Sequence, residues 1–267
     1  MRVKAWIALT KASIMDVLQF RLSVFVMLLG NIIYLVVIYN LWKAIYASVD
    51  NGTVNGMSFN DTMIYLVLAS AQFTFMEAYL VWDMGRSIQS GKIVLDLLKP
   101  IPIEQYKLFG IEGGNIAAFV LTFIPTFIIV QIITKGAIPM GINLLYYLIA
   151  ATLGMLINFS IDFFVGTICL YTESTWGINI MKEVVVLFLS GATVPLAFFP
   201  DKLKEIAMFL PFQAIYNTPL TFLTSNELTT MESFKMLGTQ LIWVIVLFVI
   251  AKIFWKLSER VITVNGG

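Results

Sequence analysis

Two acidic residues stand inside long apolar runs and are the first candidates for chemistry. Glu77 interrupts the run 62–82, and Asp162 interrupts the run 141–170, with Asn158 one helical turn before it. A carboxylate in apolar surroundings is costly unless it is paired, solvated or protonated. Glu77, Asn158 and Asp162 are therefore candidates for lining a translocation path. The alternative is that a hydroxyl or backbone group of a neighbouring helix satisfies each acid.

The residue types that the sequence lacks exclude most enzymatic chemistry. It has no histidine and a single cysteine, Cys169, which excludes imidazole catalysis, histidine zinc sites and an intrachain disulfide. It contains no G-x-x-x-x-G-K-[ST] phosphate loop, so we expect no ATP hydrolysis by a Walker mechanism. The glycines of "GIEGGN" (110–115) predict a tight helix start or a close helix–helix contact. We assign no catalytic, metal-binding or cofactor-binding residue.

The composition is that of a membrane protein, with 59% hydrophobic and 12% charged residues. Soluble domains average roughly 45–50% apolar and 25% charged residues. A helix needs about 20 apolar residues to cross a hydrocarbon core roughly 30 Å thick. The apolar runs predict an all-α polytopic membrane protein with six transmembrane helices. The predicted spans are 22–42, 62–82, 113–134, 141–170, 184–199 and 236–257, of which the fifth is short and the sixth requires Lys252 and Lys256 to reach the interface.

The distribution of lysine and arginine predicts the orientation, because cytoplasmic flanks carry the positive excess. With both termini in the cytoplasm, more than twice as many basic residues lie inside as outside, and Lys182 is counted inside.

The net charge of +1 without a basic stripe predicts no nucleic-acid partner. The first apolar run is too long for a signal peptide and has no cleavage pattern after it, so we expect it to be retained.

Residues 1–20 predict an amphipathic helix at the cytoplasmic membrane surface. Apolar side chains recur there at helical spacing, with Lys4, Lys11 and Asp16 off the stripe. The stripe consists of Val3, Trp6, Ile7, Ile14, Val17 and Leu18. The alternative is an ordinary cytoplasmic lead-in to the first span.

The connection 198–235 is too apolar for a solvated loop and is punctuated by prolines. Backbone that leaves the helical conformation at membrane depth must be buried in protein or line a wet cavity. We expect a re-entrant or interfacial helical segment that caps an outer opening. The candidate outer gate residues are Pro195, Phe199, Pro200, Pro211 and Phe212.

The inner loop 83–109 contains "SGKIVLDLLKPIPIEQYKLFG", in which a short helix can place Ile93, Leu97 and Leu98 on one face. Lys92, Asp96 and Lys99 supply polar contacts around that face, and Pro100 and Pro102 end the helix and stiffen its exit. From the residues alone, this segment is either a helix that docks in the groove of a partner or a plain interfacial helix.

Two motifs, in this order, resemble type-2 ABC transporter permeases. "G-x-x-x-x-x-L-L-K-P-x-P", from Gly91 to Pro102, is similar to the inner-loop signature of a bacterial branch that often has arginine in place of Lys99. "LSG…P…FFP…LPF…P", from Leu189 to Pro219, resembles the last part of these permeases. With the six predicted spans and the N-terminal helix, the resemblance covers nearly the whole chain.

The resemblance implies one transmembrane permease domain, 1–267, in a bacterial cell membrane. It implies a second permease, in a homodimer or heterodimer, and separate ABC ATPase subunits that hold ATP and Mg²⁺. It also implies export of an amphipathic or lipid-like substrate, an antibiotic or a peptide. The residues that would couple the permease to the ATPase are Lys92, Ile93, Leu97, Leu98, Lys99 and Pro100.

Two other classes of function stay open. An ion-driven secondary transporter would be expected to have internal repeats with broken helices in corresponding positions, and the sequence shows no such symmetry. An intramembrane enzyme would have Glu77 and Asp162 as its acid–base pair, but no nucleophile motif accompanies them.

Overall fold

The computed structural model describes residues 2–49, 52–76, 79–136, 138, 140–172, 174–225 and 228–262. Most of this part of the chain is helical, and the prediction of an all-α polytopic membrane protein is confirmed at that level. The α-helices are α1 (Arg2–Gln19), α2 (Arg21–Ala47), α3 (Phe59–Met76), α4 (Leu80–Gln89), α5 (Ile93–Leu97), α6 (Ile103–Ile133), α7 (Ile142–Ile168), α8 (Thr175–Leu189), α9 (Asp201–Phe209), α10 (Asn217–Thr224) and α11 (Thr230–Ser258). Short 3₁₀ turns are η1 (Leu196–Phe198), η2 (Pro211–Ala214) and η3 (Glu259–Val261), and β1 (Thr53–Val54) pairs antiparallel with β2 (Met57–Ser58).

Five helical stretches in the described residues are long and apolar enough to cross a membrane. They are Leu28–Ala47, Phe59–Gln89, Ile103–Ile133, Ile142–Ile168 and Thr230–Val261. The boundaries predicted for the fifth span, 184–199, are wrong, because α8 begins at Thr175 and ends at Leu189. Gly191 follows with a φ of +82°, a left-handed conformation that suits glycine and ends the helix. At 15 residues α8 is about 22 Å long, so the count of six spans stays a prediction.

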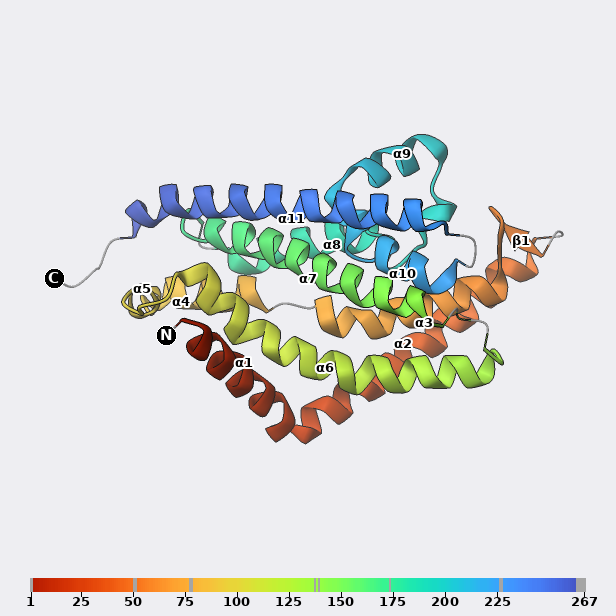
Figure 1. The fold of residues 1–267 in the computed structure, drawn as a ribbon, viewed down its shortest axis with the longest axis horizontal. Coiled ribbons are helices and arrows are strands. Elements are labelled where there is room, and N and C mark those ends of the chain that lie inside the picture. Colours follow the sequence, from red (N-terminus) through yellow and green to blue (C-terminus); the bar gives the residue numbers. More distant parts are fainter. Residues whose placement is uncertain are drawn as a thin grey trace.

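Helices α6, α7 and α11 run along the long axis between the two ends of the molecule (Figure 1). The start of α1, the end of α11 and helix α5 lie at one end, which we call the inner end. The β1–β2 hairpin, α9 and α10 lie toward the opposite end. The inner loop therefore lies on the same side as both ends of the described chain, as a pattern of paired crossings requires.

Helices extend into both predicted connections. In the inner loop 83–109, α4 continues to Gln89 and α6 begins at Ile103. In the outer segment 198–235, α11 begins at Thr230. The cause at α11 is a capping box, in which the side chains of Thr229 and Glu232 each bond the backbone N–H of the other.

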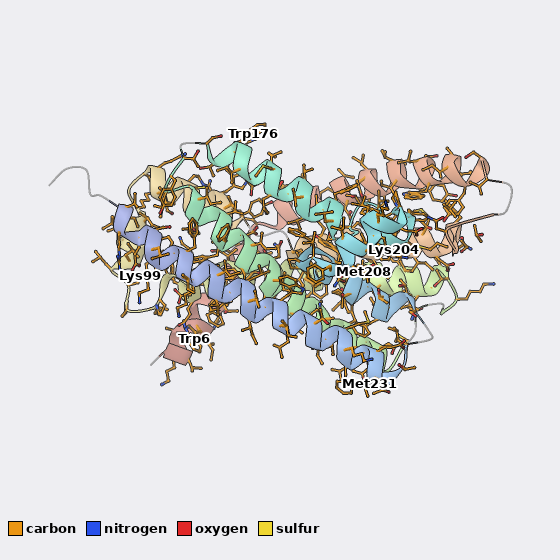
Figure 2. The ribbon with its side chains drawn as sticks, turned by 90° about the horizontal axis from the view of Figure 1, so that it is seen from above. Trp6, Lys99, Trp176, Lys204, Met208 and Met231 are labelled. Atoms are coloured by element: carbon orange, nitrogen blue, oxygen red, sulfur yellow. The ribbon has the colours of Figure 1, made fainter. Side chains whose placement is uncertain are left out.

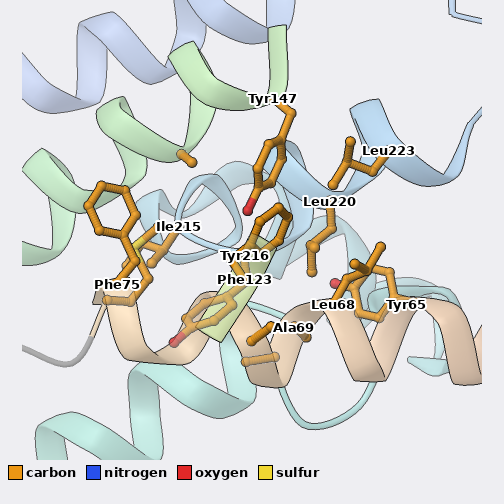
Figure 3. Close-up of a cluster of buried hydrophobic side chains, with 14 of the residues drawn as sticks. Tyr65, Leu68, Ala69, Phe75, Phe123, Tyr147, Ile215, Tyr216, Leu220 and Leu223 are labelled. Atoms are coloured by element: carbon orange, nitrogen blue, oxygen red, sulfur yellow. The ribbon is translucent and has the colours of Figure 1, made fainter. Parts of the chain in front are cut away.

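The main core lies where α3, α6, α7 and α10 meet the segment around Tyr216 (Figure 3). Tyr147 and Tyr216 are fully buried there, and the ring of Tyr147 stacks on Phe123 with centroids 4.9 Å apart. Helices α2 and α11 lie at the margin of this core and expose most of their apolar side chains. Such faces are the expected surface of a helix in lipid.

Helix α1 packs closely along α6 through glycines of the "GIEGGN" stretch. A Cβ at Gly113 would lie 2.6 Å from the carbonyl oxygen of Thr10, so no larger residue fits without movement. The N–H of Gly114 donates to Ser13 Oγ over 2.8 Å. The predicted close helix–helix contact is confirmed here.

Part of the apolar stripe predicted for α1 packs against the protein, and part of it is exposed. The ring of Trp6 stacks on Phe109 of α6, with centroids 5.1 Å apart. Val3, Ile7 and Leu18 are exposed. These exposed side chains suit a membrane surface, and the interfacial position of α1 stays a prediction.

Candidate functional site

A buried lysine joins three helices at the inner end of the molecule. Lys107 Nζ on α6 lies 2.7 Å from Asp83 Oδ2 on α4 and 2.7 Å from Asp96 Oδ2 on α5. The Lys107 side chain is only 4% exposed. One ammonium group therefore bridges two carboxylates from separate elements, and each contact is a charge-assisted hydrogen bond.

Lys99 extends this network just after α5. Its Nζ lies 2.6 Å from Asp96 Oδ1 and 3.5 Å from the centroid of the Tyr106 ring, the geometry of a cation–π contact. Burial alone would raise the pKa of Asp96, but hydrogen bonds from Lys107 and Lys99 and their charges hold it below its ordinary value. Burial alone would lower the pKa of Lys99, but its contacts with Asp96 and Tyr106 raise it. We call Asp83, Asp96, Lys99, Tyr106 and Lys107 the α5 network.

The apolar face predicted for α5 needs a correction. Ile93 is 1% exposed, because the start of this one-turn helix packs into a cluster with Met84 of α4 and Trp255 of α11. Ile93 is therefore unable to share an outward face with Leu97 and Leu98. Leu98 is 76% exposed, Leu97 is partly exposed, and the outward apolar surface is completed by Leu95.

The other predicted coupling residues lie around this surface. Lys92 and Pro100 are exposed, and Lys99 is held inward by the α5 network. A cleft of about 370 Å³ is lined by Lys99 and Pro100 and also by Lys252 and Lys256 of α11. Figure 2 shows Lys99 next to the last turns of α11.

Asp162 forms a buried ion pair between α7 and α8. Its Oδ1 lies 2.8 Å from Lys182 Nζ, and both side chains are almost fully buried. Asn158 donates to the carbonyl oxygen of Met76 over 2.7 Å and to Asp162 Oδ2 over 3.3 Å. The structure therefore brings Asn158 and Asp162 together, whereas Glu77 lies outside the described residues.

The position predicted for Lys182 also needs a correction. The charge count placed it on the inner flank of the fifth span, but it lies within α8 and faces Asp162. Without it the excess of basic residues inside still exceeds twofold. The apolar stretch "TWGINIMKEVVVLFL" carried the signal, because a lysine in the middle of such a helix is expected to have an acidic partner.

A second buried acid, Glu112 on α6, has no equivalent among the predicted site residues. Its Oε2 accepts a hydrogen bond from Asn115 Nδ2 over 3.0 Å, and it forms no ion pair within the described part of the chain. Glu112 directly precedes the third predicted span, 113–134, and this position is the signal that the sequence offers.

The outer segment enters the protein interior, where residues 215 and 216 form a turn between η2 and α10. Gln240 Nε2 of α11 donates to the carbonyl oxygens of Ala214 and Ala150, over 2.7 Å and 3.0 Å. Gln72 Nε2 of α3 donates to the carbonyl oxygen of Ile215 over 2.8 Å. Two glutamine side chains thus satisfy backbone groups that α10 and η2 leave free, as apolar surroundings require.

The five candidate gate residues fall into two groups. Pro195, Phe199 and Pro200 flank η1, where the Phe199 ring lies 5.0 Å from that of Phe188. Pro211 and Phe212 belong to η2, next to the main core. Within this one chain they form no single constriction among the described residues, and their role as a gate stays a prediction.

Comparison with known protein families gives a match over nearly the whole chain. A family model described as "ABC-2 family transporter protein" matches residues 13–266, which is nearly the whole chain. No curated protein matches the sequence.

Proposed function

We propose, since the chain belongs to the ABC-2 family of transporter proteins, that it is the membrane-spanning permease subunit of an ABC exporter. Permeases of this family are transport components of the membrane and associate in general with ABC ATPase subunits. The five long apolar helices agree with a multi-pass membrane protein. A bacterial cell membrane, cytoplasmic termini and the export direction are parts of the proposal.

The observation that carries the proposal is the form of α5. Leu95, Leu97 and Leu98 project from the inner end, while Ile93 and the α5 network hold the base of the helix. Apolar side chains on a short helix fit a hydrophobic groove, and a fixed base lets the helix transmit motion rather than absorb it. In the proposal, this surface enters the ATPase subunit, with Lys92 and Pro100 at its rim.

The remaining parts of the proposal concern the path. We place it between this chain and a second permease, in a homodimer or heterodimer, opened and closed by rigid-body motion. Asn158 and Asp162 would contribute polar groups to it, and the groups around Phe199 and Phe212 would close its outer end. The substrate is amphipathic or lipid-like, an antibiotic or a peptide.

The test is to purify the chain alone and together with an ABC ATPase from the same organism. The chain alone is expected to hydrolyse no ATP, and the pair is expected to co-purify and to hydrolyse ATP. Hydrolysis by the isolated chain would contradict the proposal. The proposal would also be contradicted if the chain bound none of the ABC ATPases that the organism encodes.

A further inference from the structure

A cleft of about 620 Å³ opens between α4 and the start of α8, on residues that the proposed function does not use. Its lining consists of Trp82, Arg86, Gln89, Ser174, Thr175 and Trp176. The α5 network uses a different face of α4, where Asp83 points toward Lys107. One face of α4 therefore contacts the α5 network, and another lines the cleft.

The sequence of α4 builds one wall of this cleft. Trp82, Arg86 and Gln89 follow one another at i, i+4 and i+7, so they lie on one helical face. Gln89 Nε2 donates to Thr175 Oγ1 over 3.3 Å. A Cβ at Gly85 would lie 2.4 Å from Thr175 Cγ2, so the absence of a side chain lets α8 start directly against α4. The floor of the cleft is therefore fixed by packing.

The side chains around this floor have the chemistry of a headgroup site. Arg86 is exposed and forms no ion pair with any described residue, so its charge is available to a ligand. A guanidinium binds phosphate oxygens through paired hydrogen bonds. Trp176 is 65% exposed, at the first turn of α8 on the outside of the bundle (Figure 2). Tryptophan combines an apolar ring with an N–H donor and favours the membrane–water interface.

We propose that this cleft binds the phosphate-bearing headgroup of an anionic amphiphile. Arg86 binds the phosphate, and Trp82 and Trp176 contact the apolar part beside it. The site lies toward the inner end of α4, within reach of headgroups of the inner leaflet. It requires no ATPase and so goes beyond the proposed permease function.

The experiment measures binding of defined probes to the purified full-length chain by native mass spectrometry. The probes are dihexanoyl-phosphatidylglycerol, dihexanoyl-phosphatidylcholine and inorganic phosphate. The wild-type chain is expected to bind phosphatidylglycerol more tightly than phosphatidylcholine. Arg86→Gln is expected to weaken phosphatidylglycerol binding about tenfold or more, because a charge-assisted hydrogen bond is lost. Arg86→Lys should recover part of the binding.

Arg260→Gln is the matched control, because Arg260 is also an exposed arginine close to the inner end. Binding by this variant should equal that of the wild type. If Arg86→Gln and Arg260→Gln bind phosphatidylglycerol equally well, the site is refuted. Equal binding of phosphatidylcholine and phosphatidylglycerol by the wild type refutes it too.

A tryptophan variant separates a lipid headgroup from a free phosphate compound. Trp176→Leu changes an exposed side chain, so the fold should be kept, and it should weaken phosphatidylglycerol binding several-fold. If inorganic phosphate binds as tightly as phosphatidylglycerol and Trp176→Leu changes neither, the amphiphile is refuted and the ligand is a free phosphate compound.

Discussion

The ammonium group of Lys107 lies 2.7 Å from Asp96 Oδ2 and ties the one-turn helix α5 to α6. An isolated helix of five residues is unstable, because nucleation is unfavourable and so short a helix forms too few hydrogen bonds to offset it. The conformation of α5 must therefore come from its tertiary contacts, which are the burial of Ile93 and the ionic contacts of Asp96. The direction in which Leu95, Leu97 and Leu98 point depends on the same contacts.

Lys107→Met is expected to loosen α5 while leaving the membrane helices in place. It removes the cation shared by Asp83 and Asp96, and breaking a buried pair costs about 3–5 kcal/mol. Asp83 is 43% exposed and can be hydrated, so we expect a loss nearer about 2 kcal/mol. The unfolding midpoint in detergent should fall and stimulation of the partner ATPase should be lost, with Lys107→Arg restoring part of both. An unchanged midpoint and full stimulation would show that the network does not hold α5.

Leu98→Asp is expected to abolish binding of the ATPase without affecting the fold. Leu98 is exposed in the isolated chain, but a charge there would be buried unpaired in the partner's groove, at a cost of several kcal/mol. Lys92→Ala removes an exposed charge and should cost about 0–1 kcal/mol of binding. The measurement is co-purification with the ATPase after normal membrane insertion has been verified. If Leu98→Asp binds the ATPase as well as the wild type does, α5 is only a membrane-surface helix.

The corrected face of α5 shows what a sequence pattern leaves open. The prolines and the spacing of the leucines indicated a short inner helix, and the structure has one at Ile93–Leu97. The pattern did not distinguish Ile93 from Leu98, because burial of Ile93 depends on Trp255, far away in the sequence. In the same way, the sequence predicts Lys182 as a flanking charge, whereas in the structure it pairs with Asp162, which is also distant in the chain. Periodicity predicts helices and faces, whereas partners distant in the chain decide which face is covered.

The ion pairs of the α5 network are expected to stabilise the protein at neutral pH and to lose this effect in acid. The pKa of Asp96 lies below its ordinary value of 3.8, so its contribution is complete above that value and is lost as the pH falls through the lowered pKa. The pKa of Lys99 is raised above 10.5, so its contribution is complete below that value and is lost only at higher pH. The unfolding midpoint of the wild type minus that of Asp96→Asn should be constant from about pH 5 to 9 and shrink below about pH 4. A difference that changes between pH 6 and 8 would exclude Asp96 as the titrating group.

Gln240→Leu is expected to destabilise the outer segment. It leaves the carbonyl oxygen of Ala214 without the partner seen here, and a buried unpaired polar group costs about 1–3 kcal/mol. Thr239→Leu is the matched control, because Thr239 is exposed and bonds only within its own helix. Chemical unfolding in detergent should separate the two variants by at least about 1 kcal/mol. Equal stability would mean that Gln240 does not support this segment.

Asp162 and Lys182 allow a structural role to be separated from a role in transport. Asp162→Asn leaves a buried ammonium unpaired, and Lys182→Met leaves a buried carboxylate unpaired, so each should cost about 3–5 kcal/mol. The double variant removes both charges, and replacing a whole buried pair is often neutral, so its stability should return close to that of the wild type. If Asp162 lines the path, the double variant should fold and bind the ATPase but transport poorly. Chemical unfolding and transport into inverted membrane vesicles measure the two properties separately. Full transport by a stable double variant would show that the pair only joins α7 to α8, and the polar groups of the path would then have to be sought elsewhere, first at Glu112.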